Sequence, residues 1–482
     1  MDLQKLFKPK SMAVVGISRK NPNSPGRIIV VKNEFEMNVK VYGIHPEGGE
    51  IEGINLHTRL DELPETPDVL VIAVGAADTL KYIQDCADLN IPSAIIIGGG
   101  FAEVQNKKGI RLQNELVEIA FDNDIAVLGP NCIGVYAPPL VDTIFLPTER
   151  ITRPPKGSVA LISQSGGVLV DQFFTKFTER NIGVSTAVSI GNRAVVDETM
   201  LLEYFSKVDT ETTNIAFYLE GFKDKRARKF LKLANESEDT VITFFGGITE
   251  EGKVATQSHT ASLAGNYKIL KSALKQYHVI QPKSERELLT YLKVFDILSQ
   301  KKKPFGENVI TYGNVAILSV SGGHGVLCSD MLKKYGLNAV KFTQKEKNDM
   351  FATMNPVARR IASFNNPIDV TGSVLDTDIE NLVGYLSDID RIECILLLLL
   401  PYPPNISFQI GRRISNVISM KRKPVICFIP YIQKYSLIIE SLELSNIPVF
   451  HSIKEAVQAA SALKLRTRIN NLKKDNTFWE HD

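Results

Sequence analysis

Short apolar runs alternate with longer stretches of helical periodicity along almost the whole chain of 482 residues. Many of these runs end in Gly, Ser or Pro, and a helix-period segment usually follows. This pattern is typical of parallel sheets that carry helices on both faces, whose buried strands are continuously apolar. Strands are predicted at Met12–Val15, Val69–Val74, Ala94–Ile97, Ile125–Leu128, Ala160–Ile162, Ile215–Leu219, Val241–Phe245, Val315–Ser319, Cys394–Leu400 and Val425–Phe428.

Two proline-rich or lysine-rich segments divide the chain. Pro138-Pro139 and Arg153-Pro154-Pro155-Lys156-Gly157 bracket a first connector, and Lys301-Lys302-Lys303-Pro304 marks a second. At usual domain sizes, the length fits about three domains. We therefore predict α/β domains at residues 1–140, 150–300 and 306–470, followed by a polar tail at 471–482.

Charge and cysteine usage exclude several classes of partner. The formal net charge is only +2, which gives no general case for nucleic acid or an acidic membrane surface. The five cysteines form neither a CxxC pair nor a metal-ligand spacing, as expected for reduced thiols in the cytosol. The N-terminus lacks the apolar core of a signal peptide, and the longest apolar run, Cys394–Leu400, is too short to span a bilayer. We expect a cytoplasmic protein that binds no metal on this chain.

One strand-turn-helix unit occurs twice. The run from Ala160 to Leu169 contains Ser163-Gln164-Ser165-Gly166-Gly167, and the run from Ala316 to Leu327 contains Ser319-Val320-Ser321-Gly322-Gly323. The second and third domains are therefore predicted to be two versions of one flavodoxin-like design.

The repeated turn has the composition of an anion cradle. Glycine after a strand permits a sharp turn with uncovered amides, and the following helix adds unpaired N–H groups and a partial positive charge. Such a turn binds phosphate without a cationic side chain, although one copy alone equally fits a capped turn with no ligand. Two copies favour anion binding. The predicted phosphate ligands are Ser165, Gly166 and Gly167 in the first copy and Gly322, Gly323, His324 and Gly325 in the second.

The first domain begins with a Rossmann-type strand and glycine turn, Met12 to Gly16, without a full GxGxxG. The longer turn suits the phosphates of a CoA-like ligand at least as well as NAD. Glu47 is a poor candidate for the acid that would bind the ribose of NAD. Further Gly- or Pro-rich strand ends are expected to line the same sheet edge. The predicted cofactor-binding residues are Gly16, Ser18, Arg19, His45, Pro46, Val74, Gly75, Gly99 and Asn131.

His259 is the candidate phosphoryl carrier. Its neighbours in the run from Gln257 to Gly265 are small or hydroxylated, so we expect an accessible loop rather than a core position. Neutral imidazole is a good nucleophile, and an oriented ring needs a carboxylate partner. Glu220, which follows the predicted strand Ile215–Leu219, is the candidate; a solvent-facing loop acid is the alternative.

These segments together resemble the alpha subunit of the ADP-forming acyl-CoA (acetyl-CoA) synthetases, relatives of succinyl-CoA synthetase. The resemblance covers nearly the whole chain. It is carried, in order, by Gly129-Pro130-Asn131-Cys132, Ser165-Gly166-Gly167, Ser189-Ile190-Gly191-Asn192, Tyr218-Leu219-Glu220-Gly221, Ser258-His259-Thr260 and Asn366-Pro367-Ile368-Asp369-Val370-Thr371-Gly372.

The resemblance implies a Rossmann-like CoA-binding domain followed by two flavodoxin-like, succinyl-CoA ligase-like domains. It implies that His259 is transiently phosphorylated, that Glu220 orients it, and that the two Ser-Gly-Gly turns hold the phosphoryl group. The implied reaction converts acyl-CoA, phosphate and ADP reversibly into acid, CoA and ATP. A small carboxylic acid would be the substrate. The resemblance also implies that ADP or ATP with Mg²⁺ binds an ATP-grasp beta subunit, in an α2β2 assembly.

Some positions depart from the family pattern. Gly75 replaces a usual proline, Phe245 and Ile248 stand where lysine and arginine are common, and His324 occupies a position that is usually proline or small. Two alternatives remain at this stage: a catalytically inactive CoA-binding sensor or scaffold, and an NAD-linked dehydrogenase. The sequence specifies neither the acid nor the physiological direction.

Overall fold

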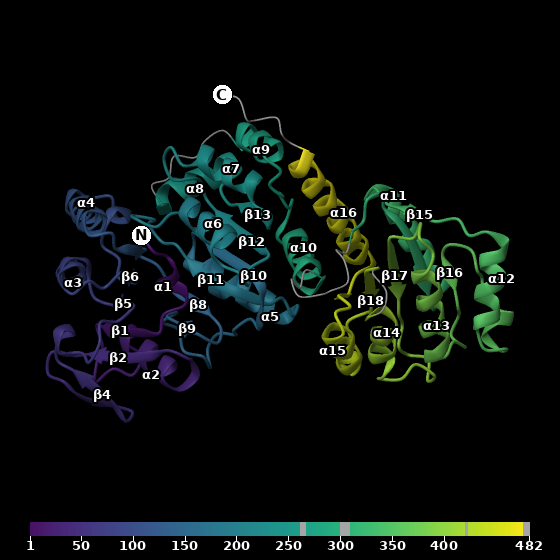
Figure 1. The fold of residues 1–482 in the computed structure, drawn as a ribbon, viewed down its shortest axis with the longest axis horizontal. Helices are drawn as coiled ribbons and strands as arrows, with labels where there is room; N and C mark the ends of the chain where they lie inside the picture. The colour runs from purple at the N-terminus through teal and green to yellow at the C-terminus, as the bar shows by residue number, and fades with distance from the viewer. Residues whose placement is uncertain (261–266, 299–308, 420–422, 476–482) are drawn as a thin grey trace. The chain divides into compact units, whose positions relative to one another are not determined.

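The computed structural model describes residues 1–260, 267–298, 309–419 and 423–475 (Figure 1). The chain forms two compact units, Met1–Lys283 and Ser284–Asp482, and each is described by itself below.

The first unit contains a seven-stranded sheet in the order β3-β4-β2-β1-β5-β6-β7. Apart from the antiparallel pair of β3 with β4, neighbouring strands are parallel. Its strands are β1 (Ser11–Val15), β2 (Lys40–Ile44), β3 (Gly49–Ile51), β4 (Ile54–His57), β5 (Val69–Ile72), β6 (Ser93–Ile96) and β7 (Ala126–Leu128).

Helices cover both faces of this sheet. Alternate β1 residues enter different cores: Met12 packs with α1 (Gln4–Phe7) and α2 (Pro25–Glu36). Ala13 lies in the core that contains residues of α3 (Ala76–Asp88) and α4 (Lys107–Asp122). The alternation of side chains along a strand therefore places an apolar layer on each face, as the apolar runs predicted.

A second sheet of the same unit has the order β13-β12-β10-β11-β8-β9. Its parallel strands are β10 (Lys156–Ser163), β11 (Val184–Ser189), β12 (Asn214–Leu219) and β13 (Thr240–Phe245). The accompanying helices are the π-helical turn η3 (Val168–Phe174), α5 (Thr175–Glu179), α6 (Glu198–Lys207), α7 (Ala227–Glu236), α8 (Glu250–Thr260) and α9 (Tyr267–Gln276).

The segment around Pro138-Pro139 is not a simple connector. It joins β8 (Val135–Ala137) to β9 (Val141–Asp142), and this antiparallel pair extends the second sheet beside β11. Buried Val135, Tyr136 and Val141 explain the pairing, since their apolar side chains complete the sheet's core. Residues 135–140, predicted within the first domain, thus pair with the second sheet.

The second unit is a parallel sheet in the order β15-β14-β17-β18-β19, with β16 also paired to β14. Its strands are β14 (Asn314–Ser319), β15 (Asn338–Ala339), β16 (Ile368–Asp369), β17 (Cys394–Leu398), β18 (Val425–Phe428) and β19 (Val449–Phe450). Its α-helices are α10 (Glu285–Leu298), α11 (Gly322–Lys334), α12 (Gln344–Thr353), α13 (Asp376–Ser387), α14 (Ile410–Ser419), α15 (Ser436–Leu444) and α16 (Ile453–Asp475). The helix α10 thus groups with the second unit, whereas the predicted second domain extended to residue 300. The predicted domain boundary stays a prediction.

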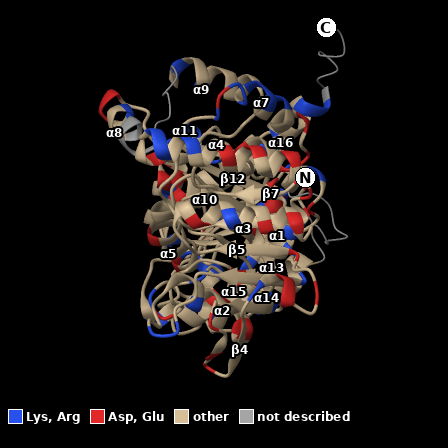
Figure 2. Cartoon of the chain, turned by 90° about the vertical axis from the view of Figure 1, so that its left-hand side faces the viewer, with Lys and Arg blue, Asp and Glu red and all other residues tan. Residues whose placement is uncertain are grey.

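The distribution of charged side chains and the state of the cysteines agree with the near-neutral net charge and the scattered cysteine positions. Lys and Arg alternate with Asp and Glu over the face shown in Figure 2. All five cysteines are buried and unpaired. Within the described ranges, no helix has the length and apolarity needed to cross a membrane, and no group of acidic, His and Cys side chains is placed to hold a metal ion.

Candidate active site

The residues predicted to bind the cofactor follow five parallel strands of the first sheet. Each group begins within three residues of the end of its strand, so all of them lie at the carboxyl edge of that sheet, where open α/β sheets bind ligands. They are Gly16, Ser18 and Arg19 after β1, His45 and Pro46 after β2, Val74 and Gly75 after β5, Gly99 after β6, and Asn131 after β7.

Gly16 makes a tight turn directly after β1. Its φ is +86°, and a Cβ there would lie 2.3 Å from the Ala73 carbonyl oxygen. The Ser18 hydroxyl accepts from the Asn21 amide at 3.0 Å, and the Arg27 guanidinium donates to the Arg19 carbonyl at 2.9 Å. These bonds hold the long turn against the start of α2 and leave the Arg19 side chain half-exposed.

Gly75 is the N-cap of α3. No atom lies within 4 Å of the position that a Cβ would occupy there, so the amino end of α3 is open to a ligand. The positive end of the helix makes this edge suitable for an anionic group.

The first Ser-Gly-Gly turn has the geometry of an anion cradle. The Ser165 hydroxyl accepts from the Val168 amide at 3.3 Å, and the helix begins at Gly166. A Cβ at Gly166 would lie 2.5 Å from Ile133, so only glycine permits this close approach. The helix predicted after this turn is present, and its part from Val168 to Phe174 is π-helical. In the part of the chain that the structure describes, the Gly166 and Gly167 amides have no hydrogen-bond acceptor.

Glu220 lies beside this cradle. It follows β12, the parallel neighbour of β10, and its amide donates to the Gln164 side chain at 2.8 Å. Burial, together with the charge of Glu220, raises the pKa of Tyr218 to about 12, so the Tyr218 hydroxyl stays protonated near this carboxylate at neutral pH. The two predicted features, carboxylate and cradle, are therefore at one sheet edge.

Position 259 is in α8, in its last turn, rather than in the predicted loop. Glu250 and Glu251 in the first turn favour this helix, and the Thr249 hydroxyl accepts from the Gly252 amide at 3.0 Å. The His259 side chain lies outside the described residues, as do residues 261–266, so its role stays a prediction.

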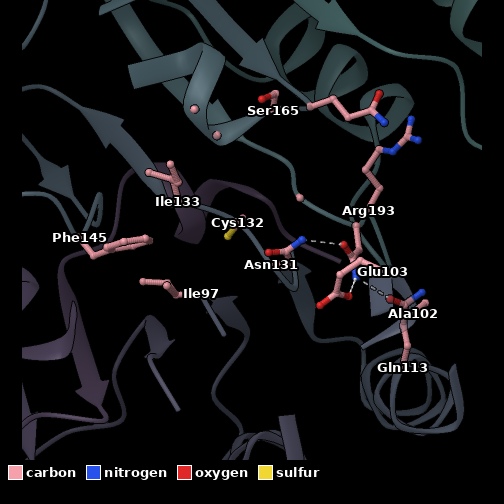
Figure 3. Close-up of a pocket in the computed structure, with 15 residues that line it drawn as sticks. Ile97, Ala102, Glu103, Gln113, Asn131, Cys132, Ile133, Phe145, Ser165 and Arg193 are labelled. Carbon is pink, nitrogen blue, oxygen red and sulfur yellow. Dashed lines mark hydrogen bonds between the residues drawn. The ribbon is translucent and has the colours of Figure 1, made fainter. Parts of the chain in front are cut away.

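A cavity of about 350 Å³ joins the edge of the first sheet to the first cradle (Figure 3). One wall is apolar and another is polar, and Ser165, Gly166 and Gly167 form a third part of the lining. The remaining lining residues are Ile97, Ala102, Glu103, Gln113, Asn131, Cys132, Ile133, Phe145, Gln164, Gly191, Asn192 and Arg193.

A hydrogen-bonded network forms the polar wall. The Asn192 amide donates to Glu103 at 2.6 Å and to Gln113 at 3.0 Å, and Asn131 donates to Asn192 at 3.4 Å. Glu103 also accepts from the Gly100 and Phe101 amides, which fixes the glycine loop after β6. The network thereby ties the predicted cofactor edge to the loop after β11.

Arg193 connects this loop to the neighbourhood of Glu220. It is 7% exposed, and its guanidinium donates to the Gly221 carbonyl at 2.8 Å and to Glu198 at 3.1 Å. The ion pair with Glu198 stabilises the buried Arg193 charge. The bond from Arg193 to the Gly221 carbonyl then connects the loop after β11 to the loop after β12.

The second Ser-Gly-Gly turn begins α11 in the second unit. Gly322, Gly323, His324 and Gly325 occupy its first turn, and His324 Nδ1 lies 3.1 Å from the Ser321 hydroxyl. A Cβ at Gly322 would lie 2.7 Å from Asp369 Oδ2, so a carboxylate already flanks this helix end.

Two departures from the family pattern have different surroundings. Phe245 is buried and packs edge-on against Phe222, with ring centroids 5.8 Å apart, so the aromatic ring fills core space. Ile248 is exposed. An aromatic contact in the core thus occupies the position of Phe245, where a lysine or arginine is common in the family.

Sequence reasoning missed Glu103, Gln113, Phe145 and Arg193 as lining residues. Asn192 stands in a motif that carried the resemblance, but it was given no role. An acid shortly after three glycines was the available signal for Glu103. No such signal in the sequence points to Phe145, because only tertiary folding brings this residue to the cavity.

Comparison with known proteins agrees with this architecture. Residues 10–138 match the family model of a CoA binding domain, and residues 156–295 match that of a succinyl-CoA ligase like flavodoxin domain. These matches confirm the predicted fold class: a CoA-binding domain followed by a ligase-like flavodoxin domain.

Relatives extend the similarity to nearly the whole chain. The alpha subunit of acetate–CoA ligase [ADP-forming] I of Pyrococcus furiosus is 31% identical over 96% of this chain and 97% of its own length. Acetate–CoA ligase [ADP-forming] I of Archaeoglobus fulgidus is 29% identical over 97% of this chain, which spans 64% of that protein.

A solved structure, the dinucleotide forming acetyl-coenzyme A synthetase 1 of Ca. Korarchaeum cryptofilum in complex with phosphate and ADP, is 29% identical. It has a TM-score of 0.86, and the match covers 99% of both chains. The chain therefore belongs to the family of the alpha subunits of ADP-forming acetate–CoA ligases.

Proposed function

We propose that this chain is the acyl-transferring subunit of an ADP-forming acid–CoA ligase. The observation that carries the proposal is the single cavity that joins the carboxyl edge of the first sheet to the first anion cradle. A thioester bound at that edge can present its carbonyl to a phosphate on the cradle. The full-length similarity to named ligases supports an active enzyme over a CoA sensor, and the match to a CoA binding domain supports CoA over NAD.

The residues at the first sheet edge fit CoA. The open amino end of α3 at Gly75 and the exposed Arg19 guanidinium offer an amide-rich and a cationic site for its phosphates. Gly16, Ser18, His45, Pro46, Val74, Gly99 and Asn131 would line the remainder of the bound molecule.

The first cradle would activate phosphate transfer by electrostatics. Ser165, Gly166 and Gly167 hold inorganic phosphate at the positive end of the helix. A phosphate oxygen then attacks the thioester carbonyl, the C–S bond breaks, and the products are an acyl phosphate and the CoA thiol. The amides that bound the phosphate stay in place for the acyl phosphate.

His259 would take the phosphoryl group next. A ring nitrogen attacks phosphorus, the bond to the acyl oxygen breaks, and the free acid leaves. Glu220 would hold the ring in one tautomer and stabilise its positive charge. Gly322, Gly323, His324 and Gly325 would form a second cradle for the phosphoryl group, beside the Asp369 side chain.

The final transfer to ADP would use a partner. Two relatives are named as alpha subunits, and the Archaeoglobus fulgidus relative is longer than this chain. We propose an ATP-grasp beta subunit that binds ADP or ATP with Mg²⁺, in an α2β2 assembly in the cytoplasm.

Reconstitution tests the proposal. The chain, combined with an ATP-grasp subunit, should form ATP from acyl-CoA, phosphate and ADP, and the chain alone should not. A complex that binds CoA but forms no ATP with any thioester of a broad panel would support the inactive sensor instead.

A further inference from the structure

The cavity has an apolar end beside the first cradle. Figure 3 shows Phe145 next to Ile97 and Ile133, whereas Glu103, Asn131 and Arg193 lie on the other side. A Cβ on Gly166 would lie 2.5 Å from Ile133, so the apolar end directly adjoins the amides that would hold phosphate.

We infer that this end receives the tail of the acyl group and that Phe145 sets the size of acid the enzyme accepts. The inference rests on the proposed function. With its phosphate on the Gly166 and Gly167 amides, an acyl phosphate would direct its tail against Ile133 and Phe145.

Two largely buried cationic side chains donate to the backbone on either side of Phe145. On one side of it, Lys32 donates to the Ile144 carbonyl; on the other, Arg153 donates to the Leu146 carbonyl at 3.0 Å. The loop is therefore bound at both carbonyls that flank Phe145 in sequence.

The Asp142 carboxylate forms ion pairs with both Lys32 and Arg153. Its two oxygens lie 3.0 Å from Lys32 Nζ and 2.8 Å from Arg153 Nε, and its Oδ1 also accepts from the Ile144 amide at 3.0 Å. The side chains of Lys32, Asp142 and Arg153 are 4%, 1% and 11% exposed. Charges this deeply buried are costly unless they are paired and hydrogen-bonded, so their pairing gives the loop one defined conformation. Lys32, Asp142 and Arg153 are thus positioning residues for Phe145.

The lining of the apolar end limits the kind of tail. The cavity has a volume of about 350 Å³, and Ile97, Ile133 and Phe145 form its apolar end. An uncharged tail fits this end, whereas a tail that ends in a carboxylate does not, because an unpaired charge there would lose its hydration.

The apolar end therefore favours an acid whose tail carries no charge, with Phe145 limiting its bulk. The test uses the complete enzyme with its partner subunit and measures kcat/KM for acetyl-, isobutyryl-, phenylacetyl- and succinyl-CoA. Wild type should prefer the two aliphatic thioesters over the other two.

Phe145→Ala should raise the phenylacetyl-to-acetyl ratio of kcat/KM at least tenfold, since one or two groups in an apolar pocket already change discrimination by about that factor. Phe145→Leu should raise it less and guards against misfolding of the alanine variant. Phe121→Ala is the matched control, because Phe121 is 51% exposed on α4 and does not line the cavity. It should leave the ratio unchanged.

Arg153→Leu should move the ratio in the same direction as Phe145→Ala, and Arg153→Lys should restore part of the wild-type preference. An unchanged ratio in both Phe145 variants of an active enzyme would overturn the inference and leave the proposed function standing. A wild-type complex that uses none of the four thioesters, but another of the broad panel, would overturn the inference alone; one that uses no thioester of the broad panel would overturn both.

Discussion

The two glycines of each cradle should respond in opposite ways to alanine. A Cβ at Gly166 would lie 2.5 Å from Ile133 Cγ1 and 2.6 Å from its Cδ1, whereas the nearest atom to a Cβ at Gly167 is an Asp171 oxygen at 3.7 Å. Both glycines are helical, so alanine gains up to about 1 kcal/mol of helix propensity at either position.

Only Gly166→Ala must also displace a packed side chain, which costs about 1–3 kcal/mol. The two variants should therefore differ by about 1–3 kcal/mol in the free energy of unfolding of the first unit, with Gly167→Ala the more stable. Urea unfolding, followed by circular dichroism, measures this difference directly. Equal stabilities, or a more stable Gly166→Ala, would show that Ile133 does not confine this helix end.

The two glycines of the second cradle also differ in the space that an added Cβ would have. A Cβ at Gly322 would lie 2.7 Å from Asp369 Oδ2, and one at Gly323 would meet nothing within 4 Å. Because the Asp369 carboxylate is the end of a movable side chain, the penalty for Gly322→Ala should be smaller than that for Gly166→Ala.

Two further perturbations have defined outcomes. Gly16→Ala should abolish CoA binding measured by calorimetry, because its Cβ would lie 2.3 Å from a backbone oxygen; Gly53→Ala, which shares a positive φ but has nothing within 4 Å, should bind normally. Burial raises the pKa of Cys328 to about 12 from an unfolded value near 9.0, so the stability that this thiol contributes is complete below about pH 9 and is lost as pH rises. Between pH 8 and 10, Cys328→Ala should lose about 1.4 kcal/mol less unfolding free energy than wild type; an identical loss would contradict this assignment.

The sequence predicted much of the fold because buried parallel strands are continuous apolar runs. All ten strands predicted in this way are present, with ends that differ by a few residues. The strand β11 was not among them, because Ser185, Thr186 and Ser189 interrupt its apolar pattern. The hydroxyls of Ser185 and Ser189 have partners elsewhere in the chain: the Ser185 and Thr212 hydroxyls lie 2.7 Å apart, and the Ser189 hydroxyl accepts from the Ile133 amide at 3.1 Å. A single segment cannot reveal such partners.

The candidate site was predicted only in part, and for a similar reason. Glycine turns after strands led to the predicted cofactor edge and to both predicted cradles, since a turn of this kind is a local property of the chain. The apolar end of the cavity depends on Lys32 reaching the loop at Ile144, which is 112 residues further along the chain. No local pattern encodes that contact, so Phe145 was missed.

The central claim is that His259 carries the phosphoryl group, and radioactive phosphate tests it most directly. The complete enzyme, incubated with labelled phosphate and a short-chain acyl-CoA in the absence of ADP, should incorporate acid-labile label on this chain. His259→Asn should bind CoA normally and incorporate none. Label of equal amount in His259→Asn, or an unlabelled wild type that nevertheless forms ATP, would contradict the account.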